Sequence, residues 1–137
     1  MKLFIDSSAL VKRYIHEEGT DVVNQLCANA SEVAVSILCV TEVLSACDRL
    51  LREEKINNEQ YQWIKNELFL DIEQSIVIDI THDVVKTSIL CLEKGSIRTL
   101  NALQAASAHI YECDLFITSD KRQGLCAEET GLPVKKT

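Results

Sequence analysis

The sequence predicts an α/β domain in which a parallel sheet is covered by helices on both faces. Short apolar runs of strand length alternate along the chain with longer segments that have a helical period. Alternating strands and helices favour right-handed crossovers, which produce a parallel sheet that is buried on both faces. With 137 residues, of which 47% are hydrophobic, the chain is long enough to bury a core of its own. We therefore expect one domain over residues 1–137.

The predicted strands are short apolar runs bounded by polar or turn-forming residues. Their β-branched content is typical of strands, and the last of them contains Pro133, which is tolerated at the edge of a sheet. In chain order, the predicted strands cover residues 3–5, 33–35, 76–78, 115–117 and 132–134.

The predicted helices are amphipathic segments that begin at residues able to cap an N-terminus. In chain order, they cover residues 9–14, 22–27, 38–51, 61–69, 84–92 and 100–111, followed by a last helix that ends at Gly131. Their predicted first residues or caps are Ser7 and Ser8, Thr20 or Asp21, Ser36, Asn57 or Asn58, Thr81 and Thr99. Gly95 is expected to end the fifth helix in the left-handed conformation.

Charge, cysteine content and hydropathy restrict the class of protein. A formal net charge of −7 argues against a broad basic surface that binds nucleic acid, so any such contact must be local. The six cysteines form no C-x-x-C pair, and they are interpreted as buried thiols in a reducing cytoplasm. No apolar run approaches the roughly 18 residues that a membrane span needs. We expect a cytoplasmic protein without a membrane segment.

Two acids stand at the ends of predicted strands. Asp6 follows the first strand and Asp120 follows the fourth, so both are expected at the edge where a parallel sheet opens onto its binding crevice. Each of them is also a suitable helix N-cap, and that interpretation stays open. Glu42 lies early in the third helix, and Asn101 lies at the start of the sixth. If the first strand lies beside the fourth, all four side chains can face one crevice.

Carboxylates that converge without a partner repel one another, and a divalent cation relieves that repulsion. The predicted donors are all oxygens, which favours Mg²⁺ or Mn²⁺. Such a site suits the hydrolysis of a phosphodiester, because the cation activates water and neutralises developing charge. A cation also lets an acidic protein bind RNA, and a few basic side chains of the protein can hold the RNA backbone. The candidate basic residues are Lys12, Arg13, Arg98, Lys121 and Arg122.

Four segments of the chain resemble, in order and spacing, the successive motifs of PIN domains. They are residues 4–14, 36–43, 98–103 and 116–122. The resemblance implies a sheet of about five strands in the order 3-2-1-4-5. Small stand-alone PIN domains are commonly the toxin halves of VapBC-type toxin–antitoxin pairs. The resemblance therefore implies a Mg²⁺-dependent endoribonuclease that forms a homodimer and is inhibited by a cognate antitoxin.

The resemblance also suggests roles for individual residues. Asp6, Glu42 and Asp120 match the acidic residues of the family, which implies that they bind the metal and take part in catalysis. Ser7 matches the hydroxyl residue beside the first acid, and Thr118 and Ser119 would support the last acid.

The chain departs from the family pattern in the sixth helix. Asn101 stands where the family usually has an aspartate, and Gln104 stands where histidine is common. Asparagine keeps an oxygen ligand but loses a charge, so the site should hold its cation more weakly. Three explanations stay open: an active three-carboxylate enzyme, a naturally degenerate domain that only binds or dimerises, and an inactivating substitution that was introduced.

Two of the predicted helices carry more apolar residues than one buried stripe requires. They span residues 36–52 and 58–70. We hypothesise that they form the surface for a second copy of the chain or for the antitoxin.

Overall fold

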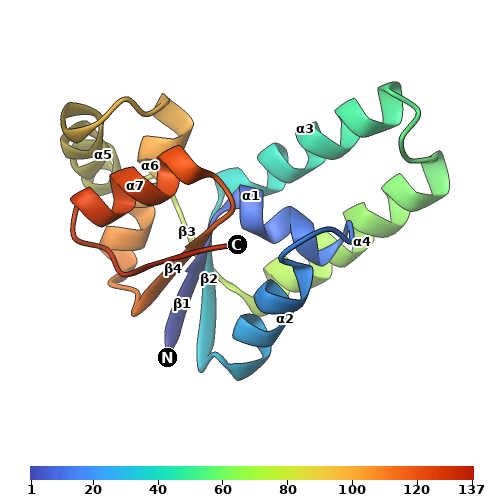
Figure 1. Ribbon diagram of the computed structural model, residues 1–137, viewed down its shortest axis with the longest axis horizontal. Helices are drawn as coiled ribbons and strands as arrows, with labels where there is room; N and C mark the ends of the chain where they lie inside the picture. The colour runs from blue at the N-terminus through green and yellow to red at the C-terminus, as the bar shows by residue number, and fades with distance from the viewer.

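A parallel sheet runs through the centre of the computed structural model, which describes residues 1–137 (Figure 1). Its five strands lie in the order β3-β2-β1-β4-β5, and all neighbouring strands are parallel. The α/β fold class and the predicted strand order are confirmed. The strands are Lys2–Ile5 (β1), Glu32–Ser36 (β2), Ile76–Ile78 (β3), Leu115–Thr118 (β4) and Val134–Lys136 (β5).

Helices cover both faces of the sheet. On one face lie α1, α2, α3 and α4, and on the other lie α5, α6 and α7 (Figure 1). Their bounds are Ser7–Leu10 (α1), Thr20–Asn29 (α2), Leu38–Arg52 (α3), Asn58–Gln74 (α4), His82–Lys94 (α5), Thr99–Tyr111 (α6) and Lys121–Glu129 (α7). A short 3₁₀ helix, Val11–Arg13 (η1), continues α1. None of the helices combines the length and the apolar composition that crossing a membrane requires.

The two helical layers rest on separate hydrophobic cores. Successive strand residues point to opposite faces of a sheet, so Leu3 and Ile5 of β1 join the core under α1–α4, whereas Phe4 joins the core under α6 and α7. Phe4 stacks on Phe116 of β4, with ring centroids 5.7 Å apart. Because β1 is the middle strand, all three of these β1 side chains are fully buried.

The predicted N-caps Asn57 and Thr81 are confirmed, as is the capping role that stayed open for Asp6 and Asp120. Asn57 caps α4 through a complete capping box, in which its side chain and that of Gln60 each accept a hydrogen bond from the other residue's backbone N–H. Thr81 caps α5 by accepting from the N–H of Val84.

Other predicted caps were wrong. Asp6, not Ser7 or Ser8, caps α1, since its carboxylate reaches the N–H of Ala9. The cap of α2 is Gly19, whose φ of +93° suits a residue without a Cβ. Thr20 instead accepts from the N–H of Glu17 and donates to the carbonyl of Lys12, and so it joins the helix to the preceding loop.

Three further boundaries differ from the prediction in detail. The residue that caps α3 is Ile37, although the hydroxyl of Ser36 does accept from the N–H of Leu38 at 3.2 Å. Gly95 ends α5 in an extended conformation, with φ −163°, and lies against Cys126 and Glu129. The predicted left-handed cap was wrong: the carbonyl of Gly95 accepts from the N–H of Ile97 at 3.0 Å, and this bond holds the loop before α6. That helix begins at Thr99, as predicted, with Arg98 as its cap.

Helices α3 and α4 extend together beyond the sheet as an arm, which we call the α3–α4 arm (Figure 1). Along the arm, Val43 and Cys47 of α3 and Ile64 and Leu68 of α4 are buried in one core. Of the two helices that were predicted to carry surplus apolar surface, α3 and α4, only α4 exposes large apolar side chains. The large apolar side chains that the helices leave exposed lie mainly on α4 and α5, and they include Trp63, Phe69, Leu70, Val85, Ile89, Leu90 and Leu92.

Candidate active site

The two strand-end acids lie next to each other at one edge of the sheet. Strands β1 and β4 are paired neighbours, with Ile5 opposite Ile117, so the residues that follow them leave the sheet side by side. Both acids are also N-caps: Oδ1 of Asp6 accepts from the N–H of Ala9, and Oδ1 of Asp120 accepts from that of Gln123, each at 3.0 Å. The capping role therefore fixes the position of both carboxylates at the mouth of the sheet.

Burial makes the Asp6 carboxylate unusually basic. Its side chain is 3% exposed, and this desolvation raises its pKa from the ordinary value of 3.8 to about 6. Hydrogen bonds from Thr118, Ser8 and the backbone of Ala9 lower the pKa in part, whereas the negative charge of Asp120 raises it. The site thus holds a buried carboxylate, that of Asp6, beside the like charge of the partly exposed Asp120.

A network of hydroxyl groups supports these acids. Ser8 donates to Oδ1 of Asp6 at 2.7 Å and accepts from the N–H of Ser119 at 2.9 Å, so it ties the end of β1 to the end of β4. Thr118 accepts from the N–H of Asp120 at 3.0 Å, while the hydroxyl of Ser119 contacts Thr137 at 2.7 Å. Ser8 was predicted as a helix cap and not as a support of Asp6, although its position two residues after the acid was the available signal.

Glu42 reaches the site from α3 and is held by side chains alone. Its Oε1 accepts from the hydroxyl of Ser7 at 2.9 Å and from Nε2 of Gln104 at 2.7 Å. Gln104 also donates to the Ser7 hydroxyl at 2.8 Å, which closes a triangle between α1, α3 and α6. Ser7 therefore contacts the acid from α3 rather than the neighbouring Asp6. Gln104 is 1% exposed, and its own amide oxygen has no hydrogen-bond partner.

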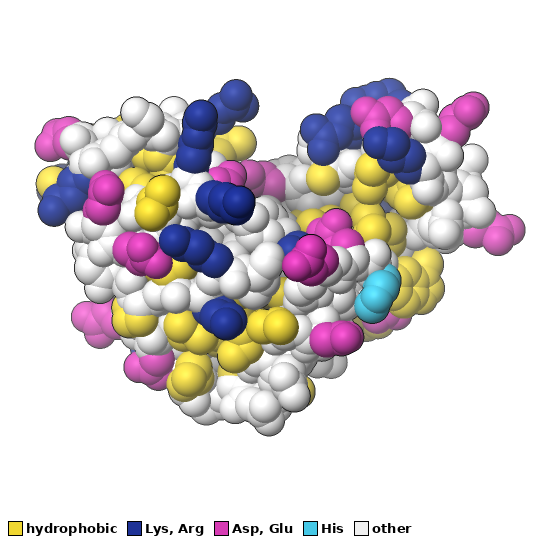
Figure 2. Space-filling model, in the orientation of Figure 1, with side chains coloured by type: hydrophobic (Ala, Val, Ile, Leu, Met, Phe, Trp, Pro, Cys, Tyr) yellow, Lys and Arg dark blue, Asp and Glu magenta, His cyan; other side chains and the backbone are white.

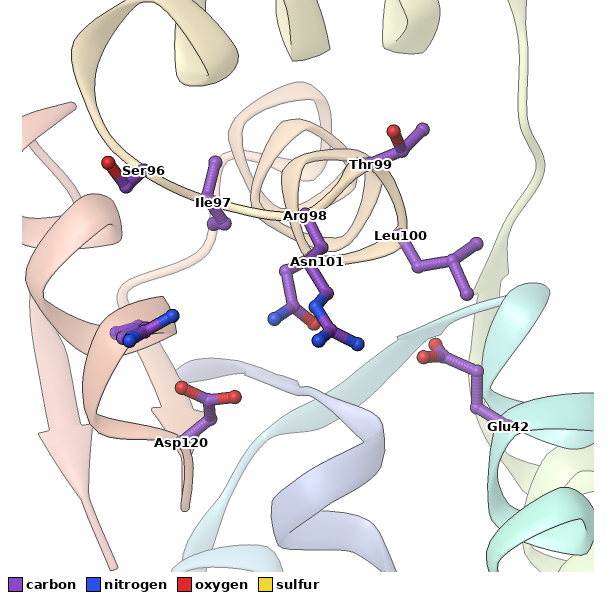
Figure 3. Close-up of a pocket in the computed structure, with 9 residues that line it drawn as sticks. Glu42, Ser96, Ile97, Arg98, Thr99, Leu100, Asn101 and Asp120 are labelled. Atoms are coloured by element: carbon purple, nitrogen blue, oxygen red, sulfur yellow. The ribbon is translucent and has the colours of Figure 1, made fainter.

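Asn101 lies in the first turn of α6, with its carboxamide directed into the same space as the Asp120 carboxylate (Figure 3). Glu42 stands on the opposite side of that space (Figure 3). The backbone carbonyl of Asn101 accepts from Nε2 of Gln123 at 2.9 Å, so α7 fixes the start of α6. Gln123 is fully buried and, like Gln104, leaves its amide oxygen without a partner.

Two adjoining cavities bring the predicted site residues together. Asp6, Ser7, Glu42, Asn101 and Asp120 all line a cavity of about 420 Å³. A larger cavity of about 660 Å³ is also lined by Glu42, Asn101 and Asp120 (Figure 3). The three residues common to both cavities mark where the two spaces meet.

The donors suit a hard divalent cation in their chemistry, because they are carboxylate and amide oxygens. No three acidic, histidine or cysteine side chains of the chain form a ready-made metal-binding group, however. The raised pKa of Asp6 and the like charge of Asp120 are conditions that a bound cation would relieve. The chemistry of these residues therefore fits a divalent cation at this edge of the sheet.

The predicted basic residues have different surroundings. Arg98 and Arg122 line the larger cavity. Lys12 is 8% exposed and donates to the carbonyl of Thr137 at 2.7 Å, and Arg13 lies 3.9 Å from Asp71, so both have partners within the protein. Lys121 lines a shallow hollow next to Ser119, Lys136 and Thr137 rather than either of the site cavities.

One basic residue of the site was not predicted. Arg49 lines the smaller cavity together with Glu42. The two residues are seven positions apart on α3, a spacing of about two helical turns that places them on the same face. That spacing was the available signal in the sequence.

The sequence matches the family model of the PIN domain over residues 3–128. The chain belongs to the PIN domain family. No curated protein matches the sequence.

Solved structures of PIN-fold proteins are similar to this chain over almost its whole length. The toxin VapC20 of Mycobacterium tuberculosis, named as cleaving the sarcin-ricin loop, gives a TM-score of 0.72 at 14% identity and covers 98% of this chain and 99% of its own. A toxin–antitoxin complex from Klebsiella pneumoniae gives 0.70 at 15% identity, with coverage of 98% and 96%. VapBC2 of Rickettsia felis, bound to a promoter DNA fragment, gives 0.70 at 13% identity, with coverage of 100% and 99%. At such identities the likeness establishes the shared fold.

Proposed function

We propose that this PIN domain is a metal-dependent endoribonuclease and the toxin component of a toxin–antitoxin pair. The observation that carries the proposal is the cavity in which Asp6, Glu42, Asn101 and Asp120 meet. Cavities lined by several carboxylates and flanked by arginines suit a phosphodiester substrate, because the arginines bind phosphate while the carboxylates hold a cation. The likeness in fold to VapC20 and to toxin–antitoxin complexes supports the biological role.

The proposed cofactor is Mg²⁺ or Mn²⁺, held by Asp6 and Asp120 with Asn101 and Glu42 at the same cavity. When bound, the cation supplies charge neutralisation at the phosphate and lowers the pKa of water. Ser7 and Gln104 occupy Oε1 of Glu42, which leaves its Oε2 to orient the attacking water and accept its proton. Arg98 and Arg122 bind phosphate oxygens and offset the negative charge that develops on them.

A second candidate function rests on Asn101. An asparagine contributes no charge, and no three acidic side chains form a ready-made metal group. These observations favour, as the alternative, a catalytically impaired PIN domain that acts as a binding or dimerisation module.

The proposed partners are an antitoxin protein and a second copy of the chain. The apolar side chains exposed on α4 and on α5 support association through either face of the sheet, since exposed apolar patches mark interaction surfaces. Sedimentation analysis at micromolar concentration tests the homodimer, and a monomer there would refute it. Co-expression with the product of a neighbouring gene tests the antitoxin, with a stable co-purified complex as the expected result.

The experiment that separates the enzyme from the binding module compares the protein with its Asn101→Asp variant. Mn²⁺ binding is measured by calorimetry, and cleavage of single-stranded RNA is measured for both proteins. Binding and cleavage by both mean that three carboxylates suffice, whereas binding and cleavage by the variant alone identify a nuclease disabled at one ligand. If neither protein binds the metal, the enzyme proposal is wrong.

A further inference from the structure

The α3–α4 arm places an unpaired arginine at the active-site cavity. Arg49 lines the smaller cavity with Glu42 and Ala46 of the same helix. Its side chain is exposed and forms no ion pair and no side-chain hydrogen bond. Arg52, one turn further along α3, is paired with Asp48 and lines neither site cavity. The arm therefore presents the free guanidinium of Arg49 to the site, whereas that of Arg52 is paired with Asp48.

The opposite side of the site carries free arginines as well. Arg98 precedes α6 and Arg122 lies on α7; both line the larger cavity, and neither forms an ion pair. Since the two cavities meet at Glu42, Asn101 and Asp120, free arginines lie on both sides of the acidic residues. Figure 2 shows a notch between the α3–α4 arm and the α5–α7 layer, with Lys and Arg side chains on both of its rims.

Guanidinium groups beside carboxylates normally pair with them, as Arg52 and Arg13 do elsewhere in this chain. The three arginines at the site leave the carboxylates to a cation and keep their own donors for another anion. A guanidinium binds a phosphate through two parallel hydrogen bonds, and a nucleic-acid backbone presents a series of phosphates at regular spacing. Arg49 on one side of the acids and Arg98 and Arg122 on the other match a single strand of nucleic acid that crosses the notch.

We propose that the α3–α4 arm forms the second side of an RNA-binding cleft. Arg49 binds a backbone phosphate on one side of the cleaved bond, and Arg98 and Arg122 bind phosphates on the other side. The inference rests on the proposed ribonuclease function and adds to it a substrate requirement: a single strand that extends beyond the cleaved bond in both directions.

The first test measures the binding of a fluorescently labelled single-stranded RNA by anisotropy over a range of salt concentrations, with Ca²⁺, which also takes oxygen ligands, in place of Mn²⁺. Gel electrophoresis checks that the RNA stays intact. The variants are Arg49→Gln and the matched control Arg52→Gln, which removes the same charge from the same helix. We expect Arg49→Gln to weaken binding about fivefold and to reduce the slope of log K against log[salt] by about 0.7, the value for one phosphate contact to a single strand. Arg52→Gln should leave both quantities near those of the wild type.

The outcomes separate this inference from the proposed function. If the wild type binds RNA and the two variants behave alike, the arm is not a binding surface, while the ribonuclease proposal stands. If the wild type neither binds nor cleaves RNA, both proposals fall. If Arg49→Gln weakens the binding of a poly-glutamate peptide but not that of RNA, Arg49 serves an acidic protein partner and the inference is wrong.

The second test asks whether the contacts lie on opposite sides of the cleaved bond. Cleavage rates with Mn²⁺ are compared on oligonucleotides shortened from the 5′ or the 3′ side of the cut, with Arg49→Gln and Arg98→Gln. Shortening one side should abolish the effect of Arg49→Gln, and shortening the other should abolish that of Arg98→Gln. Loss of both effects on the same shortened oligonucleotide would contradict a strand that crosses the notch. Because the Arg49 side chain forms no ion pair, its replacement should leave the fold stable, and equal thermal melting of the variant and the wild type checks this.

Discussion

The two halves of the active site are built in different ways. Asp6 and Asp120 are fixed by the backbone, because each follows a strand of the central sheet and caps the helix after it. Glu42 comes from the α3–α4 arm and is held by two side chains, Ser7 and Gln104. The strand-end half therefore follows from the fold itself, whereas the arm half depends on particular residues that single substitutions can remove.

The strongest test of the strand-end half is Asp120→Asn. Asparagine is as good an N-cap as aspartate, so the bond from the N–H of Gln123 and the fold should be kept. Removing a residue that only supports a metal ligand typically lowers metal affinity or activity about tenfold to 100-fold. This variant removes the charge of a proposed ligand itself, so we expect Mn²⁺ affinity and RNA cleavage to fall by at least about 100-fold. Calorimetry and cleavage assays measure the effect, with an unchanged circular dichroism spectrum as the control. Unaltered Mn²⁺ binding would remove Asp120 from the metal site.

The charge of Asp6 should destabilise the metal-free protein above pH 6. The folded-state pKa is about 6, against 3.8 for an ordinary aspartate, so the folded protein binds this proton more tightly and stability falls as pH rises from about 4 to about 6. Asp6→Asn keeps an oxygen for the cap and lacks this penalty. We expect the free energy of unfolding of the variant to exceed that of the wild type by up to about 3 kcal/mol at pH 7.5. Near pH 3.5 the two free energies of unfolding should be equal. Urea unfolding in EDTA at the two pH values measures this, and a less stable variant at pH 7.5 would contradict it.

Gln104→Leu tests the arm half. Leucine fills a similar volume and removes both hydrogen bonds to Glu42 and Ser7, together with an amide oxygen that has no partner. We expect cleavage to fall about tenfold to 100-fold, as is typical for partners of site residues, while Mn²⁺ affinity changes less. The matched control is Ser107→Ala, which alters an equally buried polar residue of the same helix that donates only to the backbone carbonyl of Leu103. Equal losses of cleavage in both variants would mean that Gln104 has no special role in placing Glu42.

Ser7→Ala should give the smallest effect of the series. It removes one of the two donors to Glu42 and leaves Gln104 in place. A hydrogen bond to a charged group contributes about 1.5 kcal/mol, which corresponds to about a tenfold slower cleavage. Steady-state kinetics should show this loss in kcat rather than in KM. A KM effect alone would place Ser7 at the substrate instead of at Glu42.

The difference between the two halves also explains what the sequence could predict. A strand followed by an acid is a local pattern, and parallel pairing then brings Asp6 and Asp120 together without further information. The position of Glu42 depends on contacts between residues far apart in the chain, so its partner Gln104 was visible only as a departure from a motif. The same holds for Lys12 and Arg13, whose partners Thr137 and Asp71 cannot be read from neighbouring residues.

The wrong N-caps have a related cause. Aspartate, serine and threonine all have suitable capping oxygens, so a run such as Asp6-Ser7-Ser8 offers three candidates for one helix start. Pairing of β1 with β4 decides among them, because it fixes where the strand ends and so which residue meets the free N–H groups.

The alternation of side chains along β1 couples core packing to the width of the notch. Leu3 and Ile5 support the layer that carries the α3–α4 arm, whereas Phe4 supports the layer that carries α6 and α7. Neighbouring positions of one strand thus act on opposite sides of the active site. During evolution, a change of volume at one position can move one side while leaving the other in place. The distance between the arm and the layer of α6 and α7 can therefore change, and with it the substrates that fit the notch, while the acids between them stay the same.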